Sequence, residues 1–324
     1  MNEKIDIVTV VFREEVNFLR IQARSLARYF DPEAIGEILV LINDVQESEC
    51  AAKVTDILPE YGHLAPRVRL VRSDVYFLKP ESSMAALRLA VSSKLRKWRR
   101  RSHGGWRGRS GWFTQQAAKL AAVRLATGRY MLILDAKNHF IASVGYADFV
   151  DKDGLPRTAP YIADPYHYQW TKNSYEFFGL TAPKITEMVM PPTTPFCVET
   201  EVVEKLLRYL EDRHGRVQTF FRPRPQQTIE FTLLSAFAAK EKGDWKACFS
   251  DGLEPPLVIY RNTPVESFGS ILKRIEDETP KTIGFHRSRI AEMDAAMHLR
   301  IAKIWESRHL VGSDQEGIRL LTKS

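Results

Sequence analysis

The N-terminal part of the chain alternates between short apolar runs and segments whose apolar residues recur at helical spacing. Residues 4–12, KIDIVTVVF, form an apolar β-branched run that predicts a buried strand, and a helical pattern follows it. Two further buried strands are predicted, over 37–44 ending at Asp44 and over 67–74 ending at Asp74, with a helix between them. Strands that alternate with helices in this way indicate a parallel sheet covered by helices on both faces.

A helix and a strand are predicted next in the segment that precedes residue 136. The helix is expected to start at Ser110, which can cap it, and to end at Gly128. The strand YMLILD follows at once and stops at a carboxylate, Asp135. Asp44, Asp74 and Asp135 therefore all come where ligands bind in an open parallel sheet, beyond the carboxyl ends of strands, although Asp is also common in turns.

The pattern changes from about residue 145. Aromatic and proline-rich stretches, 160–170 and 189–196, are predicted as long connections, and loops of that length inside a compact domain are usually functional. Helical spacing returns from Glu199 or Thr200 to about His214, again within 226–243, and in an amphipathic tail over 285–310 that is expected to pack back on the sheet.

Length and composition favour one large globular domain. A chain of 324 residues is at or above the size where one hydrophobic core stops growing. We therefore expect two closely fused halves, 1–145 and 146–324, within one continuous domain.

The N-terminus carries charges where a secretory signal needs an apolar stretch, and no apolar run is long enough to span a membrane. The three cysteines lie far apart, which predicts structural thiols in a reducing cytoplasm.

The charge balance points to an anionic partner. The formal net charge is +7 and the pI is near 9.2, and much of the excess lies in 94–109, KLRKWRRRSHGGWRGR. Nucleic acid, a membrane surface or a phosphorylated small molecule would each suit this charge, and a solvated basic loop is the structural alternative. Trp98 and Trp106 favour a contact, since tryptophan in a basic loop usually stacks on or inserts into something.

Five stretches of the sequence together resemble a bacterial family of nucleotide-sugar-dependent glycosyltransferases with the GT-A fold. They are IDIVTVVF, LINDV, GWFTQQAAKL, YMLILDAKNHFI and TIEFTLL, and the resemblance runs from about residue 5 to 290. It implies a Rossmann-like, mainly parallel sheet with helices on both faces, plus C-terminal helical elements. It further implies that 1–145 binds the nucleotide sugar, of UDP or GDP type, and that 146–324 forms the acceptor side.

The resemblance also places an altered metal motif after the central strand. Such enzymes carry Asp-x-Asp there, and its carboxylates hold the ribose or a divalent cation, Mn²⁺ or Mg²⁺, over the donor diphosphate. Here the motif reads Asp135, Ala136, Lys137. A lysine ammonium can itself neutralise a diphosphate, so Lys137 is predicted to replace the cation, with Asp135 or Asn138 holding sugar or ribose hydroxyls. Capping of a turn by Asp135 and Asn138 is the alternative.

Further donor contacts are predicted on two elements. Gln116 and Lys119 share one face of a helix, where Lys119 could reach a phosphate and Gln116 a sugar hydroxyl. Asp44 and the loop 12–15, including Phe12 and Arg13, lie where the resemblance puts the nucleotide base and ribose. A solvated helix face and a helix cap are the structural alternatives for these two sets.

Glu230 and His286 complete the predicted site. Glu230, between Ile229 and Phe231, is the candidate general base for the acceptor hydroxyl, although the helix dipole alone favours glutamate in a first turn. His286 is predicted to close the donor site, by a hydrogen bond to phosphate or as a metal ligand with Asp135. Asp135 and Glu230 are thus the predicted catalytic pair.

The sequence therefore predicts a cytoplasmic glycosyltransferase in cell-surface polysaccharide or glycolipid biosynthesis. It would transfer a sugar to an acceptor hydroxyl of a glycan or lipid-linked substrate, with 94–109 contacting the inner face of the membrane. Two alternatives stay open: a non-catalytic nucleotide- or glycan-binding protein, and a nucleic-acid binder that uses 94–109. The residues leave open the donor base, the donor sugar, the acceptor, the stereochemistry, metal dependence and oligomeric state.

Overall fold

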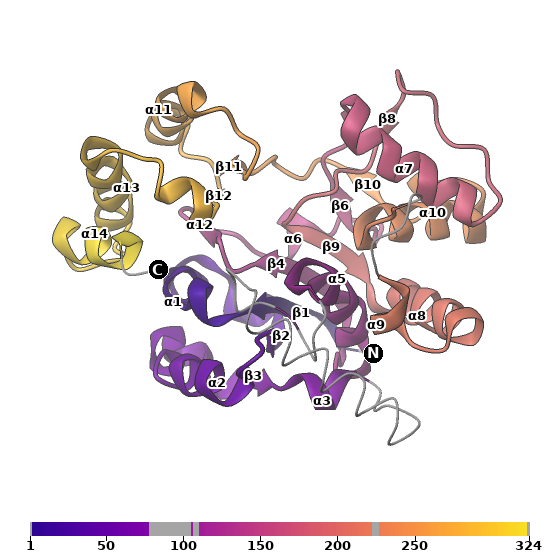
Figure 1. Ribbon diagram of the computed structural model, residues 1–324, viewed down its shortest axis with the longest axis horizontal. Helices are drawn as coiled ribbons and strands as arrows, with labels where there is room; N and C mark the ends of the chain where they lie inside the picture. The colour runs from indigo at the N-terminus through magenta and orange to yellow at the C-terminus, as the bar shows by residue number, and fades with distance from the viewer. Residues whose placement is uncertain (1, 78–104, 106–109, 222–226, 323–324) are drawn as a thin grey trace.

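A computed structural model describes residues 2–77, 105, 110–221 and 227–322 (Figure 1). The basic segment 94–109 falls outside the described residues apart from Gly105, so its predicted contacts stay predictions. The cysteines are all described; Cys50, Cys197 and Cys248 are buried and free, and burial raises the pKa of each thiol. Among the described helices, none combines the length and apolarity that crossing a membrane requires.

The core of the fold is a five-stranded sheet in the order β3-β2-β1-β4-β9. Its strands are β1 (Asn2–Val11), β2 (Ile35–Ile42), β3 (Val68–Val71), β4 (Gly128–Asp135) and β9 (Phe196–Glu199). The first four run parallel and β9 runs antiparallel to β4. The predicted α/β class with a mainly parallel sheet is confirmed.

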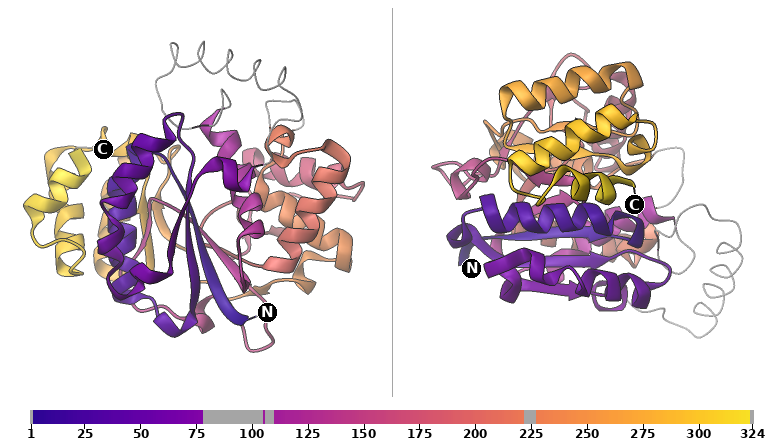
Figure 2. Two further views of the ribbon diagram at one scale, coloured as in Figure 1. Left: turned by 90° about the horizontal axis from the view of Figure 1, so that it is seen from below. Right: turned by 90° about the vertical axis from the view of Figure 1, so that its left-hand side faces the viewer.

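Helices cover both faces of this sheet, as predicted (Figure 2). Alternate residues of β1 point to opposite faces, so that Val8 and Val10 join one core cluster while Ile7 and Val11 join another. The helix α1 (Val16–Tyr29) packs in the second cluster. The first cluster is covered by α5 (Gly111–Ala121), α8 (Thr200–His214) and α10 (Glu230–Lys242).

A smaller sheet carries the C-terminal region. Its strands, β11 (Leu257–Ile259), β12 (Thr282–Phe285) and β5 (Asn138–Phe140), lie in that order. Packed around it are α11 (Phe268–Glu278), α12 (Arg287–Ile290), α13 (Ala295–Ser307) and α14 (Asp314–Thr322). The helical tail was expected on the central sheet; it instead packs on this small sheet and on α1, where Trp305 Nε1 donates to His139 Nε2 at 2.8 Å.

The remaining described elements lie between those already named. The helices and strands are α2 (Glu47–Thr55), α3 (Ser73–Tyr76), α6 (Tyr146–Phe149), α7 (Pro165–Phe177), α9 (Val217–Phe220), β6 (Arg157–Thr158), β7 (Tyr161–Ile162), β8 (Met188–Val189) and β10 (Ser250–Asp251). The 3₁₀ turns are η1 (Arg13–Glu15), η2 (Pro32–Ala34), η3 (Leu58–Arg67), η4 (Ala122–Arg124), η5 (Trp245–Ala247) and η6 (Val265–Ser267).

Three local predictions differ from the structure. Gly128 does not end a helix; it begins β4, where a Cβ would lie 2.6 Å from the Lys4 carbonyl oxygen. Asp74 lies inside α3 rather than at the end of β3, because Ser73 already starts that helix. The stretch 160–170 is not only a connection, since α7 begins within it at Pro165, with Asp164 accepting hydrogen bonds from two backbone N–H groups of the first turn.

Candidate functional site

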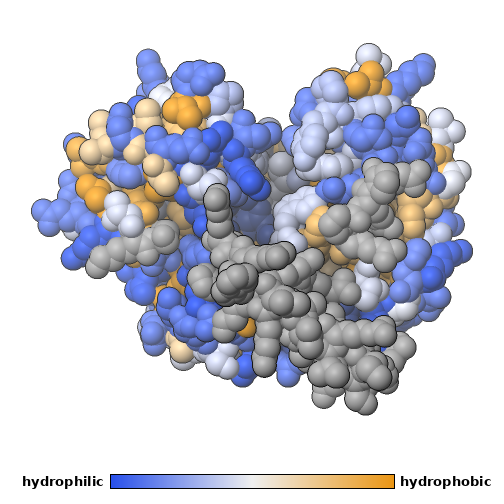
Figure 3. Space-filling view, viewed as in Figure 1, coloured by the Kyte–Doolittle hydropathy of each residue, from blue (hydrophilic) through white to orange (hydrophobic). Residues whose placement is uncertain are grey.

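A cleft of about 430 Å³ lies beyond the carboxyl ends of β1 and β4. Figure 3 shows the hollow on this face, between the part of the molecule that carries α11 to α14 and the part that carries α7 and α10. Residues from both parts line it, together with residues of α1, α5 and the turn after β4. Six of the predicted site residues line this cleft: Gln116, Lys119, Asp135, Lys137, Glu230 and His286.

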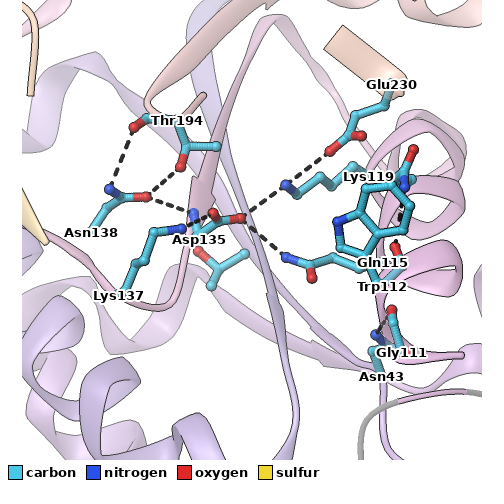
Figure 4. A network of polar contacts seen from close by, with 12 residues as sticks. Asn43, Gly111, Trp112, Gln115, Lys119, Asp135, Lys137, Asn138, Thr194 and Glu230 are labelled. Atoms are coloured by element: carbon cyan, nitrogen blue, oxygen red, sulfur yellow. Dashed lines mark hydrogen bonds and ion pairs between the residues drawn. The ribbon is translucent and has the colours of Figure 1, made fainter. Parts of the chain in front are cut away.

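Asp135 is the centre of the polar network in the cleft (Figure 4). Its Oδ1 lies 2.9 Å from Lys119 Nζ and accepts a hydrogen bond from Gln115 Nε2 at 3.1 Å, while its Oδ2 contacts the Lys137 ammonium. Lys119 Nζ also lies 3.0 Å from Glu230 Oε1. The side chains of Lys119 and Glu230 are only 5% and 6% exposed, so α5 and α10 hold a buried ion pair directly beside Asp135.

Burial and neighbouring charge act in opposite directions on this network. Burial would raise the pKa of Asp135, but the ammonium groups of Lys119 and Lys137 outweigh it and hold that pKa well below its usual range. Burial would lower the pKa of Lys119, and the carboxylates of Asp135 and Glu230 raise it instead. Asp135 and Lys119 are therefore both charged at neutral pH.

Buried polar side chains fix the turn that carries Asp135 and Lys137. Asn138 Oδ1 accepts hydrogen bonds from the Asp135 N–H at 3.0 Å and from Thr194 Oγ1 at 2.6 Å. From α1, Gln22 Nε2 donates to the carbonyl oxygens of Asp135 and Asn138 at 2.8 and 2.9 Å. These contacts leave little freedom for the turn, and they place the Asp135 and Lys137 side chains in the cleft.

One wall of the cleft is rich in positive charge. We call Lys137, Arg261 and Arg287 the cationic wall. Arg287 is paired with Glu14 at 2.9 Å, whereas Arg261 is exposed and makes no ion pair with the described residues. A cationic wall of this kind attracts an anionic ligand such as a phosphate or diphosphate.

His286 lies beside the cationic wall as a neutral donor. Burial, together with the charges of Lys137 and Arg287, lowers its pKa to about 4. Its Nδ1 accepts a hydrogen bond from the Ser288 N–H at 3.3 Å, which leaves the proton on Nε2. In this tautomer the Nε2–H group can donate a hydrogen bond to a ligand.

Four predicted residues do not line the cleft. Both carboxylate oxygens of Asp44 are occupied by Arg13, whose Nη2 lies 2.8 Å from Oδ1 and whose Nε lies 3.0 Å from Oδ2. Phe12 packs beneath the Arg287 guanidinium, whose Cζ lies 5.1 Å from the centroid of the Phe12 ring. Asn138 is fully buried in the turn. The predicted ligand roles of these residues stay predictions, and the contacts seen here are structural.

Comparison with known proteins gives the family and a distant likeness of fold. Residues 4–254 match the profile of a family of unknown function (DUF6492), which is more than half of the chain. The chain belongs to this DUF6492 family. A search of the curated proteins finds no match.

Solved structures resemble this DUF6492 member at low sequence identity. One is the apo bifunctional glycosyltransferase WbbM, with 13% identity and a TM-score of 0.45, covering 88% of this chain and 46% of that one, so the chain spans under half of its length. Another is the galactosyltransferase LgtC with donor and acceptor sugar analogues, with 11% identity and a TM-score of 0.45, covering 98% and 95%. An active-site mutant of LgtC also matches, with 11% identity, a TM-score of 0.44 and 86% of both chains.

The donor set in this DUF6492 member does not fit a divalent metal. Both Asp135 oxygens contact ammonium groups, and the neighbouring Lys137 cannot bind a cation while its ammonium is protonated. His286 presents a protonated nitrogen in the tautomer that Ser288 fixes. Within the described ranges, no three His, Cys, Asp or Glu side chains converge to hold a metal ion. The described cleft residues therefore do not form a binding site for a divalent metal ion.

Among the cleft residues that the sequence did not single out are Trp112, His167, Trp170 and Arg261, while Glu15 lies in the predicted loop 12–15 but received no role of its own. Burial and the Asp135 charge raise the pKa of Glu15 to about 7, and the side chain makes no hydrogen bond or ion pair with the described residues. The helix signal Asp164-Pro165 could have placed His167 and Trp170 three residues apart on α7. No sequence signal distinguishes Arg261 from the many surface arginines.

Proposed function

We propose that this protein is a glycosyltransferase of the GT-A type that moves a sugar from a nucleotide-sugar donor to an acceptor hydroxyl. The observation that carries the proposal is the position of Asp135. It ends β4, an interior strand of the main sheet, contacts the ammonium groups of Lys119 and Lys137, and lies in a cleft with a cationic wall. Ligands of open parallel sheets bind at this place, and cations there suit a diphosphate.

The cationic wall supplies what the leaving group needs. As the bond between the sugar C1 and the phosphate oxygen breaks, negative charge grows on the departing nucleoside diphosphate. Lys137 and Arg261 are positioned to neutralise that charge, and His286 to donate a hydrogen bond from Nε2. Because Lys137 is held by Asp135 and His286 by Ser288, these two groups need not reorganise during the reaction.

Glu230 is the candidate base on the other side of Asp135 (Figure 4). In the overall reaction the acceptor O–H proton passes to the Glu230 carboxylate, the acceptor oxygen bonds to C1, and the C1–O bond electrons leave with the nucleoside diphosphate. The ion pair with Lys119 keeps Glu230 oriented at the start of α10. The same lysine also orients Asp135, so one cation fixes both carboxylates.

The proposal extends to metal-independent use of a UDP- or GDP-type donor. Lys137 takes the place of the cation that an Asp-x-Asp motif would bind. It also extends to assembly of surface polysaccharide or glycolipid at the inner face of the membrane, with the +7 net charge and the basic segment 94–109 as its support. Unchanged liposome binding after neutralisation of the arginines in 94–109 would remove the membrane part of the proposal.

Thermal unfolding with a panel of nucleotides tests the donor site. UDP, GDP and their sugars are each added with Mn²⁺ and, separately, with EDTA, and nucleoside diphosphate release is followed in parallel. We expect one nucleotide to raise the unfolding temperature in EDTA, since a ligand at about 100 times its Kd stabilises by about 2.7 kcal/mol. Lys137→Met should remove the shift, and Lys152→Met, whose side chain is 87% exposed, should leave it unchanged.

One result would count against this function, and a second would count against its metal independence. If no nucleotide stabilises the protein, the cleft does not bind a nucleotide-sugar donor. If stabilisation requires Mn²⁺, Asp135 binds a metal and Lys137 does not replace it. The same experiment gives both answers. A thermal shift in either condition tests donor binding, and the difference between the Mn²⁺ and EDTA conditions tests the metal requirement.

A non-catalytic nucleotide- or glycan-binding protein is the second candidate. The Lys119 contact favours it, because an ammonium 3.0 Å from Glu230 Oε1 competes with an acceptor proton for that carboxylate. Binding of a nucleotide sugar without any release of nucleoside diphosphate, across a panel of saccharide acceptors, would decide for this candidate. The predicted nucleic-acid binder rests on 94–109 alone and stays a prediction.

A further inference from the structure

Aromatic side chains form the wall of the cleft opposite the cationic wall. We call Trp112, His167 and Trp170, all of which line the cleft, the aromatic wall. Trp112 comes from the first turn of α5 and the other two from α7. The ring centroids of Trp112 and Trp170 are 6.3 Å apart, and those of His167 and Trp170 are 5.2 Å apart. Two helices distant in sequence thus build one continuous aromatic surface.

This wall is unusually open for such large apolar rings. Trp112 is 41% exposed, and Trp170 is partly exposed. An exposed tryptophan gives up much of the stabilisation that burial of its ring would supply, so a cleft lined by two of them is better explained by a ligand than by folding. The wall therefore needs a ligand with an apolar face.

Gln116 adds a polar requirement at the same place. It is only 2% exposed and lines the cleft one helical turn after Trp112. Its Nε2 donates to the Trp112 carbonyl oxygen at 3.5 Å, but its buried Oε1 has no hydrogen-bond partner among the described residues. A buried acceptor without a partner destabilises the free protein, so a ligand that supplies a donor there binds more tightly.

We propose that the aromatic wall is the acceptor site and that the acceptor is a saccharide. A pyranose ring has a face of C–H groups that stacks on Trp112 and Trp170, and hydroxyls on its edge, one of which donates to Gln116 Oε1. A plain lipid chain has no donor for Gln116. This inference rests on the proposed function, since it names the class of the second substrate.

The division of the cleft supports a sugar here rather than the nucleobase of the donor. Asp135 lies between Lys137 on one side and Trp112, Lys119 and Glu230 on the other (Figure 4). A diphosphate on the cationic wall places the donor sugar near Asp135. An acceptor ring on the aromatic wall then has its hydroxyl on the side of Glu230, the candidate base.

The test measures saccharide binding and nucleotide binding separately. Labelled wild-type protein is applied to a broad glycan array, and binding of the best saccharide is quantified by saturation-transfer NMR without nucleotide. Trp112→Ala, Trp170→Ala and Gln116→Leu should each weaken saccharide binding by about tenfold or more, which corresponds to about 1.4 kcal/mol. Trp112→Phe should retain part of the affinity. Nucleotide-induced thermal shifts are measured on the same variants.

Tyr166→Ala is the matched control. Tyr166 packs on Trp170 at 4.7 Å between ring centroids, but it is 63% exposed and does not line the cleft. Its loss should change saccharide binding less than about twofold. An equal loss in Tyr166→Ala would move the binding surface out of the cleft and overturn the proposal.

The other outcomes separate this inference from the proposed function. If nucleotides bind and no saccharide on the array does, the saccharide site is refuted and the donor site stands. If Trp112→Ala abolishes nucleotide binding and spares saccharide binding, the wall stacks a nucleobase and the inference is wrong. If saccharides bind at the wall and no nucleotide binds, the transferase proposal fails while the saccharide site stands.

Discussion

The Nζ atom of Lys119 lies 2.9 Å from Oδ1 of Asp135 at the wall of the cleft, where the two side chains are 5% and 20% exposed. The same Nζ contacts Glu230, so a single ammonium group balances two carboxylates. Removal of this ammonium leaves the buried Glu230 carboxylate without the cation that it contacts and Asp135 with Lys137 alone, which costs far more than the loss of a surface pair. The cluster is therefore a structural element of the site as well as its electrostatic centre.

Replacement of Lys119 by methionine should destabilise the protein by about 3–5 kcal/mol, because the buried Glu230 carboxylate loses the cation that it contacts and Asp135 keeps only Lys137. Urea unfolding at pH 7 measures this. Lys53→Met is the control: its ion pair with Glu49 is 4.0 Å long and half-exposed, and such pairs contribute about 0–1 kcal/mol. Equal losses in the two variants would show that the cluster does not stabilise the fold.

Glu15 should make donor binding depend on pH near neutrality. Its pKa is raised to about 7, so it carries a proton below pH 7 and becomes negative above it. A new negative charge in the cleft repels a diphosphate, so the Kd for the nucleotide should rise as the pH passes about 7. Glu15→Gln should bind with little change from pH 6 to 8. Isothermal titration with the nucleotide found by the thermal panel, at several pH values, measures both.

The same shift has a consequence for stability. Glu15 in the folded protein holds its proton up to about pH 7, whereas the unfolded chain releases it near the ordinary value of 4.5. Unfolding therefore releases a proton between these values, and the free energy of unfolding falls as the pH rises from 4.5 to 7. Glu15→Gln should remove that part of the slope. Glu176→Gln, an exposed change on α7, should keep the wild-type slope, and a wild-type slope in Glu15→Gln would contradict the assignment.

Lys137→Ala should reduce kcat about 100- to 1000-fold, the range observed when one preorganised donor to a developing negative charge is removed. Nucleoside diphosphate release under saturating donor measures it. Lys137→Asp restores the Asp-x-Asp pattern and should recover part of the rate only when Mn²⁺ is present. Full activity of Lys137→Ala in EDTA would show that the leaving group is neutralised elsewhere, for example by Arg261.

The sequence predicted the elements of this site better than the contacts within them. Apolar periodicity predicted β1, β2, β4, α8 and α10. The predicted end of β4 identified Asp135 as a site residue. Periodicity cannot show which polar side chains bind each other: Asp44, predicted to bind the nucleotide, is occupied by Arg13, 31 residues away. Arg261 reaches the cleft through tertiary packing alone, and no local pattern marks it; Glu15 lies in the predicted loop 12–15, but only the tertiary packing shows that it lines the cleft.

Asn138 was predicted either to hold sugar or ribose hydroxyls or to cap the turn, and a double-mutant cycle tests its contacts within the turn. Asn138→Ala should lower the free energy of unfolding by about 1–3 kcal/mol without any ligand, because the Asp135 N–H and Thr194 Oγ1 lose their acceptor. Thr194→Val removes one of the same bonds. The double variant should therefore lose less than the sum of the two single losses, with a coupling of about 0.5 kcal/mol or more. Additive losses, or no loss in Asn138→Ala, would mean that the amide does not hold the turn. Asn138 would then return to the candidates for a direct contact with the donor.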